Sequence, residues 1–114
     1  MIAIYQILLS DSDVDRVNAE GFAAVPSAHA RASLMLGFKR WKPEYATFFT
    51  KVYEVDTDDL DQAFESTNLW NDHLVTRVRR GSSMSVGDIA VMDGNCYFCD
   101  NYGWVAMGKY EGMN

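Results

Sequence analysis

The residues best suited to chemistry are two cysteines, Cys96 and Cys99, in a segment that also carries Tyr and Phe. Two intervening residues are typical of half a zinc site or of a redox couple. A zinc ribbon requires a second pair, which the chain lacks, and the spacing of His29 and His73 matches no zinc finger. The aromatic neighbours favour a strand, on which residues three apart face opposite sides. We therefore expect structural cysteines, with no metal and no cofactor.

A second candidate is the pair Asp72 and His73, because a carboxylate beside a histidine can orient a general base. The nucleophile would have to be one of the serines in segment 81–85, and no G-x-S-x-G turn presents one. The glycine that opens this segment also suggests a phosphate loop, but neither a lysine nor a helix start follows it. The sequence therefore predicts no catalytic residues and a protein that is not an enzyme.

Acidic residues gather in the middle of the chain. Asp and Glu number 16 against 10 Lys and Arg, which gives a net charge of −6. This balance disfavours general binding to a phosphate backbone. An acidic helix face can instead attract a basic partner, although helix capping and solubility account for part of the cluster. The partner-binding residues predicted on this acidic face are Asp58, Asp59, Asp61 and Glu65.

Two basic clusters stand against this acidic background. The first interleaves cations with aromatic rings, as single-strand binders do to stack bases. The second is rich in arginine, and alternate arginines of an extended segment share a face. A solvated rim around a packed Trp41 is the more ordinary explanation of these clusters, and a protein-binding role is the third. The alternative binding residues are Lys39, Arg40, Trp41 and Lys42 in the first cluster and Arg77, Arg79 and Arg80 in the second.

The elements that position these residues alternate between helix and strand in the first two thirds of the chain. Apolar content predicts strands over 2–9 and 46–55, the latter with Phe49, Lys51, Tyr53 and Val55 on one side. Helices are expected over 11–19, from Pro26 to Gly37, and after the acidic segment 56–59. Ser10 and Gly21 are expected to bound the first helix, Asp56 or Thr57 to cap the third, and Leu60, Ala63 and Phe64 to face the core from it.

The last third predicts an antiparallel meander. A strand over 82–92 with a bend at Gly87 and Asp88 leads into the turn at residues 93–95, and further strands follow over 96–99 and 103–107. Hydrophobic residues make up 48% of the 114 residues, which excludes disorder for most of the chain. We expect one α+β domain over residues 1–114, a small antiparallel sheet with two to four short helices packed on it and a loose C-terminal end.

Several of these segments carry a family resemblance. The pieces L-D-Q-A-F-E-S-T-N, R-G-S-S-M-S-V-G-D-I-A-V and Y-G-W-V, with the first strand I-Y-Q-I-L-L-S-D, resemble the YodL-like family and related small proteins of phages and mobile elements. The chain departs from the family pattern before the serine-rich core, where Arg80 or Gly81 stands in place of a histidine. The resemblance implies no reaction and no catalytic residues. It implies a small accessory protein of a virus or plasmid that acts inside a bacterium.

Together these observations favour a phage-encoded host-takeover or anti-defence protein that binds and inhibits or redirects a bacterial protein. The partner would be a nucleic-acid enzyme or a defence complex, the location the host bacterial cytoplasm, and the chain a monomer or homodimer without membrane contact. Exposed aromatics would anchor the interface. The aromatic candidates for this role are Trp41, Trp70, Trp104 and Tyr102. The alternative is a single-strand nucleic-acid-binding module that uses the two basic clusters.

Overall fold

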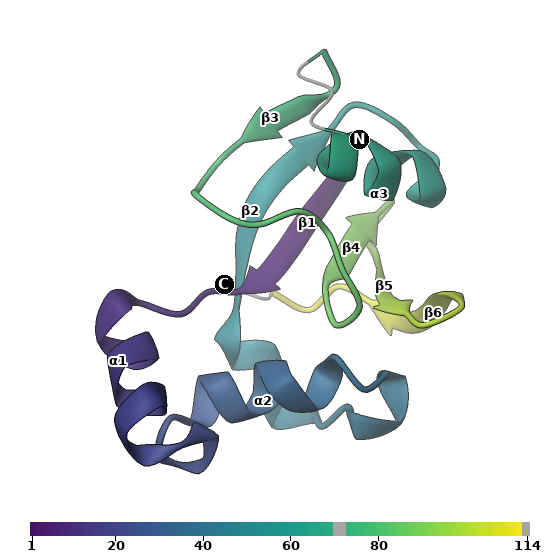
Figure 1. Cartoon of the computed structure of the whole chain (residues 1–114). Helices are drawn as coiled ribbons and strands as arrows, with labels where there is room; N and C mark the ends of the chain where they lie inside the picture. The colour runs from purple at the N-terminus through teal and green to yellow at the C-terminus, as the bar shows by residue number, and fades with distance from the viewer. Residues whose placement is uncertain (70–72, 113–114) are drawn as a thin grey trace.

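The chain forms an antiparallel sheet with helices on both of its faces, which confirms the α+β prediction (Figure 1). The structure is a computed structural model and describes residues 1–69 and 73–112. The strands lie in the order β3-β2-β1-β4-β5-β6, and every neighbouring pair is antiparallel. The strands are β1 (Ile2–Ile7), β2 (Phe49–Val55), β3 (Val75–Arg77), β4 (Ile89–Met92), β5 (Asn95–Asp100) and β6 (Gly103–Lys109). The helices are α1 (Asp11–Glu20), α2 (Pro26–Leu34) and α3 (Leu60–Leu69), with 3₁₀ turns η1 (Phe22–Ala24), η2 (Phe38–Arg40) and η3 (Pro43–Phe48).

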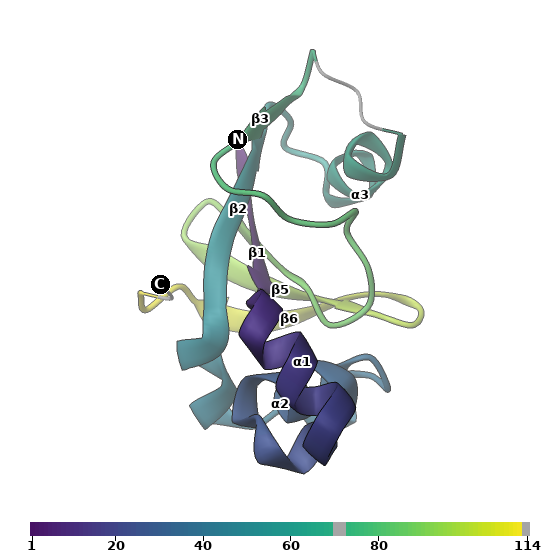
Figure 2. The same cartoon turned by 60° about the vertical axis from the view of Figure 1, so that its left-hand side comes forward.

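Strand β1 lies in the middle of the sheet and is buried on both sides. Ile2 and Ile4 pack into the core beneath α3, which lies to the right of β1 and β2 in Figure 2. Tyr5 and Ile7 pack into a second core on the other face, with α2, η2 and η3. A strand covered on both faces has no polar side, and this explains the nearly continuous apolar run at the start of the sequence. We call the two sides of the sheet the α3 face and the α2 face.

A β-bulge in β2 corrects the prediction that Phe49, Lys51, Tyr53 and Val55 share one side. Two successive residues of β1 pair with Tyr53 and Lys51, so Val52 is an extra residue in the ladder. Such an insertion shifts the alternation of side chains by one position. Phe49 consequently packs on the α2 face, whereas Tyr53 and Val55 pack on the α3 face.

Helix α1 begins and ends where the sequence predicts. The hydroxyl of Ser10 accepts a hydrogen bond from the backbone N–H of Asp13, and the Asp13 carboxylate accepts one from the backbone N–H of Ser10. This capping box satisfies two backbone donors at the helix start. Gly21, with φ at +89°, ends the helix. None of the residues in α1 is buried, so this helix is held mainly by its termini and by contact with η1.

Helix α3 is capped by Asp59 rather than by the predicted Asp56 or Thr57. The Asp59 carboxylate accepts hydrogen bonds from the backbone N–H groups of Asp61 and Gln62. The Thr57 hydroxyl accepts from the backbone N–H of Asp59 and so fixes the turn that precedes the helix. Four consecutive positions before the helix carry side chains able to cap, and composition alone does not select among them.

The predicted strand over 82–92 is wrong for its first part. Only Ile89–Met92 pairs in the sheet, as β4, while 82–85 runs across the α3 face without ladder partners in the described chain. Gly87, with φ at +100°, lies in a turn closed by the hydrogen bond from Asp88 N to Ser85 O, which confirms the predicted bend. The 93–95 turn joins β4 to β5 and confirms the predicted hairpin.

Candidate functional site

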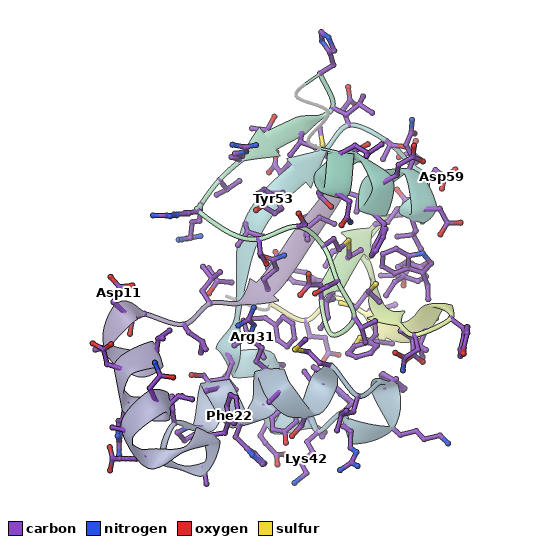
Figure 3. The ribbon with its side chains drawn as sticks, in the orientation of Figure 1. Asp11, Phe22, Arg31, Lys42, Tyr53 and Asp59 are labelled. Atoms are coloured by element: carbon purple, nitrogen blue, oxygen red, sulfur yellow. The ribbon has the colours of Figure 1, made fainter. Side chains whose placement is uncertain are left out.

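The predicted acidic residues lie on and immediately before α3 and are all exposed. Figure 3 labels Asp59 at the N-terminal end of this helix, beside the end of the molecule that carries the chain's N-terminus. Residues 61 and 65 lie one helical turn apart, so their carboxylates occupy neighbouring positions on the same outward side of α3. We call Asp58, Asp59, Asp61 and Glu65 the α3 acidic face.

Three of these four carboxylates also have partners within the domain. Asp58 accepts a hydrogen bond from the Met1 ammonium at 2.9 Å, which raises the pKa of that ammonium above its ordinary value. Asp59 caps the helix. Asp61 accepts a hydrogen bond from the indole N–H of Trp104 at 3.0 Å, and this bond ties α3 to β6. Glu65 makes no hydrogen bond or ion pair with any residue in the described ranges and is therefore available to a partner.

Exposed apolar side chains accompany these acids. Leu69 is 71% exposed and Phe64 is 36% exposed, so the prediction that Phe64 faces the core is wrong. Ala63, Ser66 and Thr67 occupy the buried side of α3 instead. Thr67 replaces an apolar residue there because its hydroxyl accepts a hydrogen bond from the backbone N–H of Met84. The helix thus turns small residues inward and leaves larger apolar groups beside its carboxylates.

The aromatic anchors separate into three classes. Trp104 is half-buried and packs against the core of the α3 face, and Trp41 is half-buried on the α2 face. Tyr102, in the turn between β5 and β6, is 99% exposed. Trp70 lies outside the described residues. Tyr102 is the one aromatic of the described set whose whole ring is offered to solvent.

The first basic cluster surrounds Trp41 on the α2 face. Lys39, Arg40 and Lys42 are exposed, and the Lys42 ammonium lies 6.0 Å from the ring centroid of Tyr45. The Trp41 ring contacts Tyr45, and two further core rings lie within 6.5 Å of it. The structure therefore shows a solvated basic rim around a partly packed indole, and base stacking by Trp41 stays a prediction.

The second basic cluster begins on the edge strand β3 and continues beside β2. Arg77 ends the edge strand β3, and Arg79 and Arg80 follow it in an exposed segment. The Arg79 guanidinium donates to the backbone carbonyl of Lys51 at 3.2 Å. In Figure 3 the label of Lys42 lies at the bottom of the molecule, whereas β3 lies near the top in Figures 1 and 2. Lys42 and β3 thus lie at opposite ends of this view (Figures 1 and 3), whereas Arg79 lies against Lys51 and Val52 of β2.

The two cysteines lie on opposite faces of the sheet, as the strand geometry predicts. Cys96 belongs to the core of the α2 face and Cys99 to that of the α3 face. Both thiols are free and buried. Burial raises the pKa of Cys96 and raises that of Cys99 to about 12, so neither is a thiolate near neutral pH. No group of three potential metal ligands occurs among the described residues.

A buried polar cluster that the sequence did not reveal fixes the serine-rich segment. The Gln6 side chain is 2% exposed; it donates to the Ser82 carbonyl and the Asp88 carboxylate and accepts from the Ser82 N–H. The hydroxyl of Tyr53 also donates to the Ser82 carbonyl. A Cβ at Gly81 would lie 2.6 Å from the Gln6 oxygen, so the glycine permits this approach. The segment that suggested a phosphate loop thus has a structural role: it crosses the α3 face and is held there by hydrogen bonds to Gln6 and Tyr53.

Asp88 carries the largest carboxylate perturbation in this cluster. Burial raises the pKa of Asp88 to about 7, against the opposing effect of hydrogen bonds from Ser85 N–H and Gln6 and of the Arg31 charge. The Asp88 carboxylate accepts hydrogen bonds from the Gln6 side chain on β1 and from the backbone N–H of Ser85, in the turn that contains Asp88. No nucleophile with a base in hydrogen-bond reach accompanies it among the contacts of the described chain, and the cluster is explained by structure.

Comparisons with protein-family models, with curated proteins and with solved structures gave no match. The YodL-like resemblance stays a prediction from the segments that carry it. None of the helices in the described part of the chain has the length and apolar character needed to cross a membrane.

Proposed function

We propose that this chain is a non-enzymatic accessory protein of a phage or mobile element. In this proposal it acts in the cytoplasm of the host bacterium, where it binds a bacterial protein through α3 and inhibits or redirects that protein.

The observation that carries the proposal is the composition of the outward side of α3. Leu69 lies one helical turn beyond Glu65, and both are exposed beside Phe64. An apolar contact surrounded by charges is the usual arrangement of a protein–protein interface, in which the apolar centre excludes water and the charged rim steers approach. The Trp104–Asp61 hydrogen bond holds α3 against β6, which gives the surface a fixed shape before binding.

The charge of the α3 acidic face selects the class of partner. Four carboxylates gather over eight residues of sequence, in a chain whose net charge is −6. Such a surface accelerates association with a basic surface and opposes association with nucleic acid. A bacterial enzyme or defence complex that handles nucleic acid presents the required basic surface, because it must bind phosphate.

The alternative proposal is a single-strand nucleic-acid-binding module. It has less support, because the net charge of −6 disfavours general binding to a phosphate backbone. The affinity-capture experiment described next distinguishes it from the protein-binding proposal.

Affinity capture with charge-matched variants tests the proposal. Wild-type protein, Glu65→Lys and Asp15→Lys are immobilised and incubated with nuclease-treated and untreated bacterial lysate. Asp15 is an exposed acid of α1 without a partner in the described chain, so both substitutions change the net charge equally at similar helical positions. We expect wild type and Asp15→Lys to retain the same bacterial protein and Glu65→Lys to lose at least about tenfold of it.

Two results would contradict the proposal. Equal loss with both variants would mean that net charge alone attracts the captured material. Retention of nucleic acid that disappears on nuclease treatment, with no protein left behind, would favour the single-strand module.

A further inference from the structure

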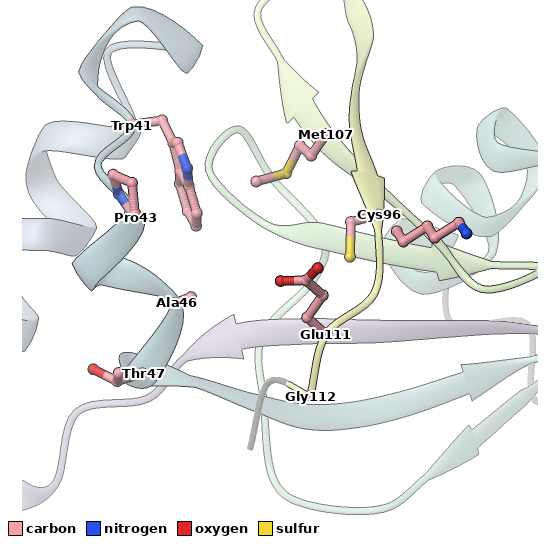
Figure 4. Close-up of a pocket in the computed structure, with 9 residues that line it drawn as sticks. Trp41, Pro43, Ala46, Thr47, Cys96, Met107, Glu111 and Gly112 are labelled. Atoms are coloured by element: carbon pink, nitrogen blue, oxygen red, sulfur yellow. The ribbon is translucent and has the colours of Figure 1, made fainter.

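A cavity in the described chain opens on the α2 face, away from α3 (Figure 4). Its volume is about 420 Å³, within the range of roughly 300–1,000 Å³ that small-ligand sites occupy. It lies between η3 with the preceding residues on one side and β5, β6 and the C-terminal segment on the other. The proposed protein-binding function makes no use of it.

A β-bulge in the β5–β6 hairpin creates the floor of the cavity. Cys96 pairs with Gly108 and Tyr97 pairs with Ala106, so Met107 is an extra residue in the ladder. Gly108, with φ at +95°, has no side chain, and a Cβ there would meet nothing within 4 Å. The position opposite Cys96 is therefore open, and the bulged Met107 lines the cavity beside it. Bulges of this kind often re-aim a side chain at a binding site.

The opposite wall is the indole of Trp41. Its ring is held by Tyr45 at 6.4 Å and 87° and by Phe49 and Phe98 at 6.0 and 6.5 Å between centroids. Figure 4 shows this indole edge-on across the opening from Met107. An aromatic face opposite a thioether suits a planar ring between them, since base–aromatic stacking contributes about 1–3 kcal/mol and sulfur–aromatic contact about 0.3–1.5 kcal/mol.

The charged groups that line the cavity are one carboxylate and one ammonium. Glu111 and Lys109 line the opening, and Figure 4 shows the Glu111 carboxylate directed into it. Exposed cations at 39, 40 and 42 flank Trp41 in the chain. Among the cations of the described chain, Lys109 is the one that lines the cavity. A carboxylate acceptor with a lysine beside it fits a ligand that carries hydrogen-bond donors on its ring and a negative charge outside the ring.

Glu111 is positioned by the residue before it. The backbone N–H of Tyr110 donates to the Gly94 carbonyl at 2.7 Å. The Tyr110 hydroxyl lies 3.1 Å from the Tyr5 hydroxyl on β1, where burial and this hydrogen bond raise the pKa of Tyr5. The carboxylate therefore follows a segment tied to the central strand, which reduces the ordering that a ligand must impose.

From this geometry we propose that the cavity binds a nucleotide with guanine as the preferred base, stacked between Trp41 and Met107. The N1–H and the exocyclic amino group of guanine are adjacent donors and together fit the two oxygens of Glu111. The phosphate lies toward Lys109. Uracil presents carbonyl oxygens on either side of its single ring donor and is repelled by the same carboxylate. A free nucleotide and a guanosine within a single strand share this chemistry.

Titration with mononucleotides tests the proposal. GMP, AMP and UMP are added to protein carrying ¹³C-labelled methionine methyl groups, and the Met107 methyl signal is identified from Met107→Leu. We expect GMP to shift this signal and to quench tryptophan fluorescence, with UMP bound at least about tenfold more weakly. A guanine-containing tetranucleotide bound more tightly than GMP would identify a strand as the source, and the reverse order would identify the free nucleotide.

Matched variants separate base recognition from folding. Glu111→Gln removes the acceptor charge on an exposed side chain, so the fold is retained, while Glu44→Gln makes the same change in η3 outside the cavity lining. We expect Glu111→Gln to lose about tenfold in GMP affinity and Glu44→Gln to bind as wild type. No Met107 shift at millimolar GMP, or equal binding of GMP and UMP, would overturn the proposal. Glu65→Lys should bind GMP normally, so the cavity and α3 are tested independently.

Discussion

Asp88 makes the stability of the fold depend on pH in an unusual direction. Its carboxyl group has an ordinary pKa of 3.8, which burial raises to about 7 in the folded chain. The folded state therefore holds a proton that the unfolded chain has already released between about pH 4 and pH 7. A shift of about three pH units at 1.36 kcal/mol per unit corresponds to about 4 kcal/mol. This stabilisation is present at acidic pH and is lost as the pH rises toward 7.

The substitution Asp88→Asn isolates this effect. An asparagine oxygen can still accept the hydrogen bonds from Gln6 and from the Ser85 N–H, but the side chain does not ionise. Between pH 5 and pH 8 we expect wild type to lose about 3 kcal/mol of unfolding free energy relative to this variant. Urea unfolding followed by tryptophan fluorescence measures both proteins, and Asp15→Asn, an exposed acid, serves as the control. Parallel pH profiles of wild type and Asp88→Asn would refute the reasoning.

Three further predictions concern the buried residues. Gln6→Leu leaves the Ser82 N–H without its partner and should lower the unfolding free energy by about 2–3 kcal/mol in urea titrations; an unchanged midpoint would contradict the role given to Gln6. Gly81→Ala forces a Cβ to within 2.6 Å of the Gln6 oxygen and should lower the melting temperature. A melting temperature above that of wild type would mean that the backbone around residue 81 shifts without cost to avoid this contact. In the variant Cys96→Ser, Cys99 should react with a thiol reagent only slowly until the protein unfolds, and fast reaction of the native variant would show that Cys99 is not buried.

The sequence predicted the individual helices and turns better than the order and pairing of the strands in the sheet. The Ser10 capping box and the Gly21 terminus depend on a few neighbouring residues, and both are present where expected. The order β3-β2-β1-β4-β5-β6 places the first strand between β2 and β4, which are separated from it by long stretches of chain. No local pattern contains that pairing. The bulge at Val52 could not be predicted for the same reason, because a residue is extra only in relation to the strand that it pairs with.

The serine-rich segment shows why its strand prediction was wrong. Its sequence has acceptable strand propensity, but Gln6 binds both backbone polar groups of Ser82, 76 residues away in the chain. Tertiary hydrogen bonds thereby replace a strand ladder over 82–85. A glutamine in an otherwise apolar strand was the signal available in the sequence. A buried polar side chain requires partners, and two glycines in the segment 81–87 allowed the chain to supply them.

Composition was enough to locate the candidate surfaces. It did not predict which of their side chains are exposed or which residues they contact. Charge density located the α3 acidic face, but its local partners, among them Trp104 for Asp61, follow from the fold. The prediction for Phe64 was wrong because the short helix buries only a narrow side, filled by Ala63, Ser66 and Thr67. The cavity beside Trp41 required the β6 bulge, which no spacing in the sequence indicates.

Site-specific photocrosslinking tests most directly whether α3 contacts a bacterial protein. A photoreactive phenylalanine derivative is placed at Leu69, which is 71% exposed, or at Val14 of α1, which is 43% exposed. After irradiation of living bacteria, we predict one dominant protein adduct from position 69, absent from position 14 and reduced by Glu65→Lys. Adducts of equal yield from both positions, or an adduct to nucleic acid alone, would contradict a protein-binding role for this helix.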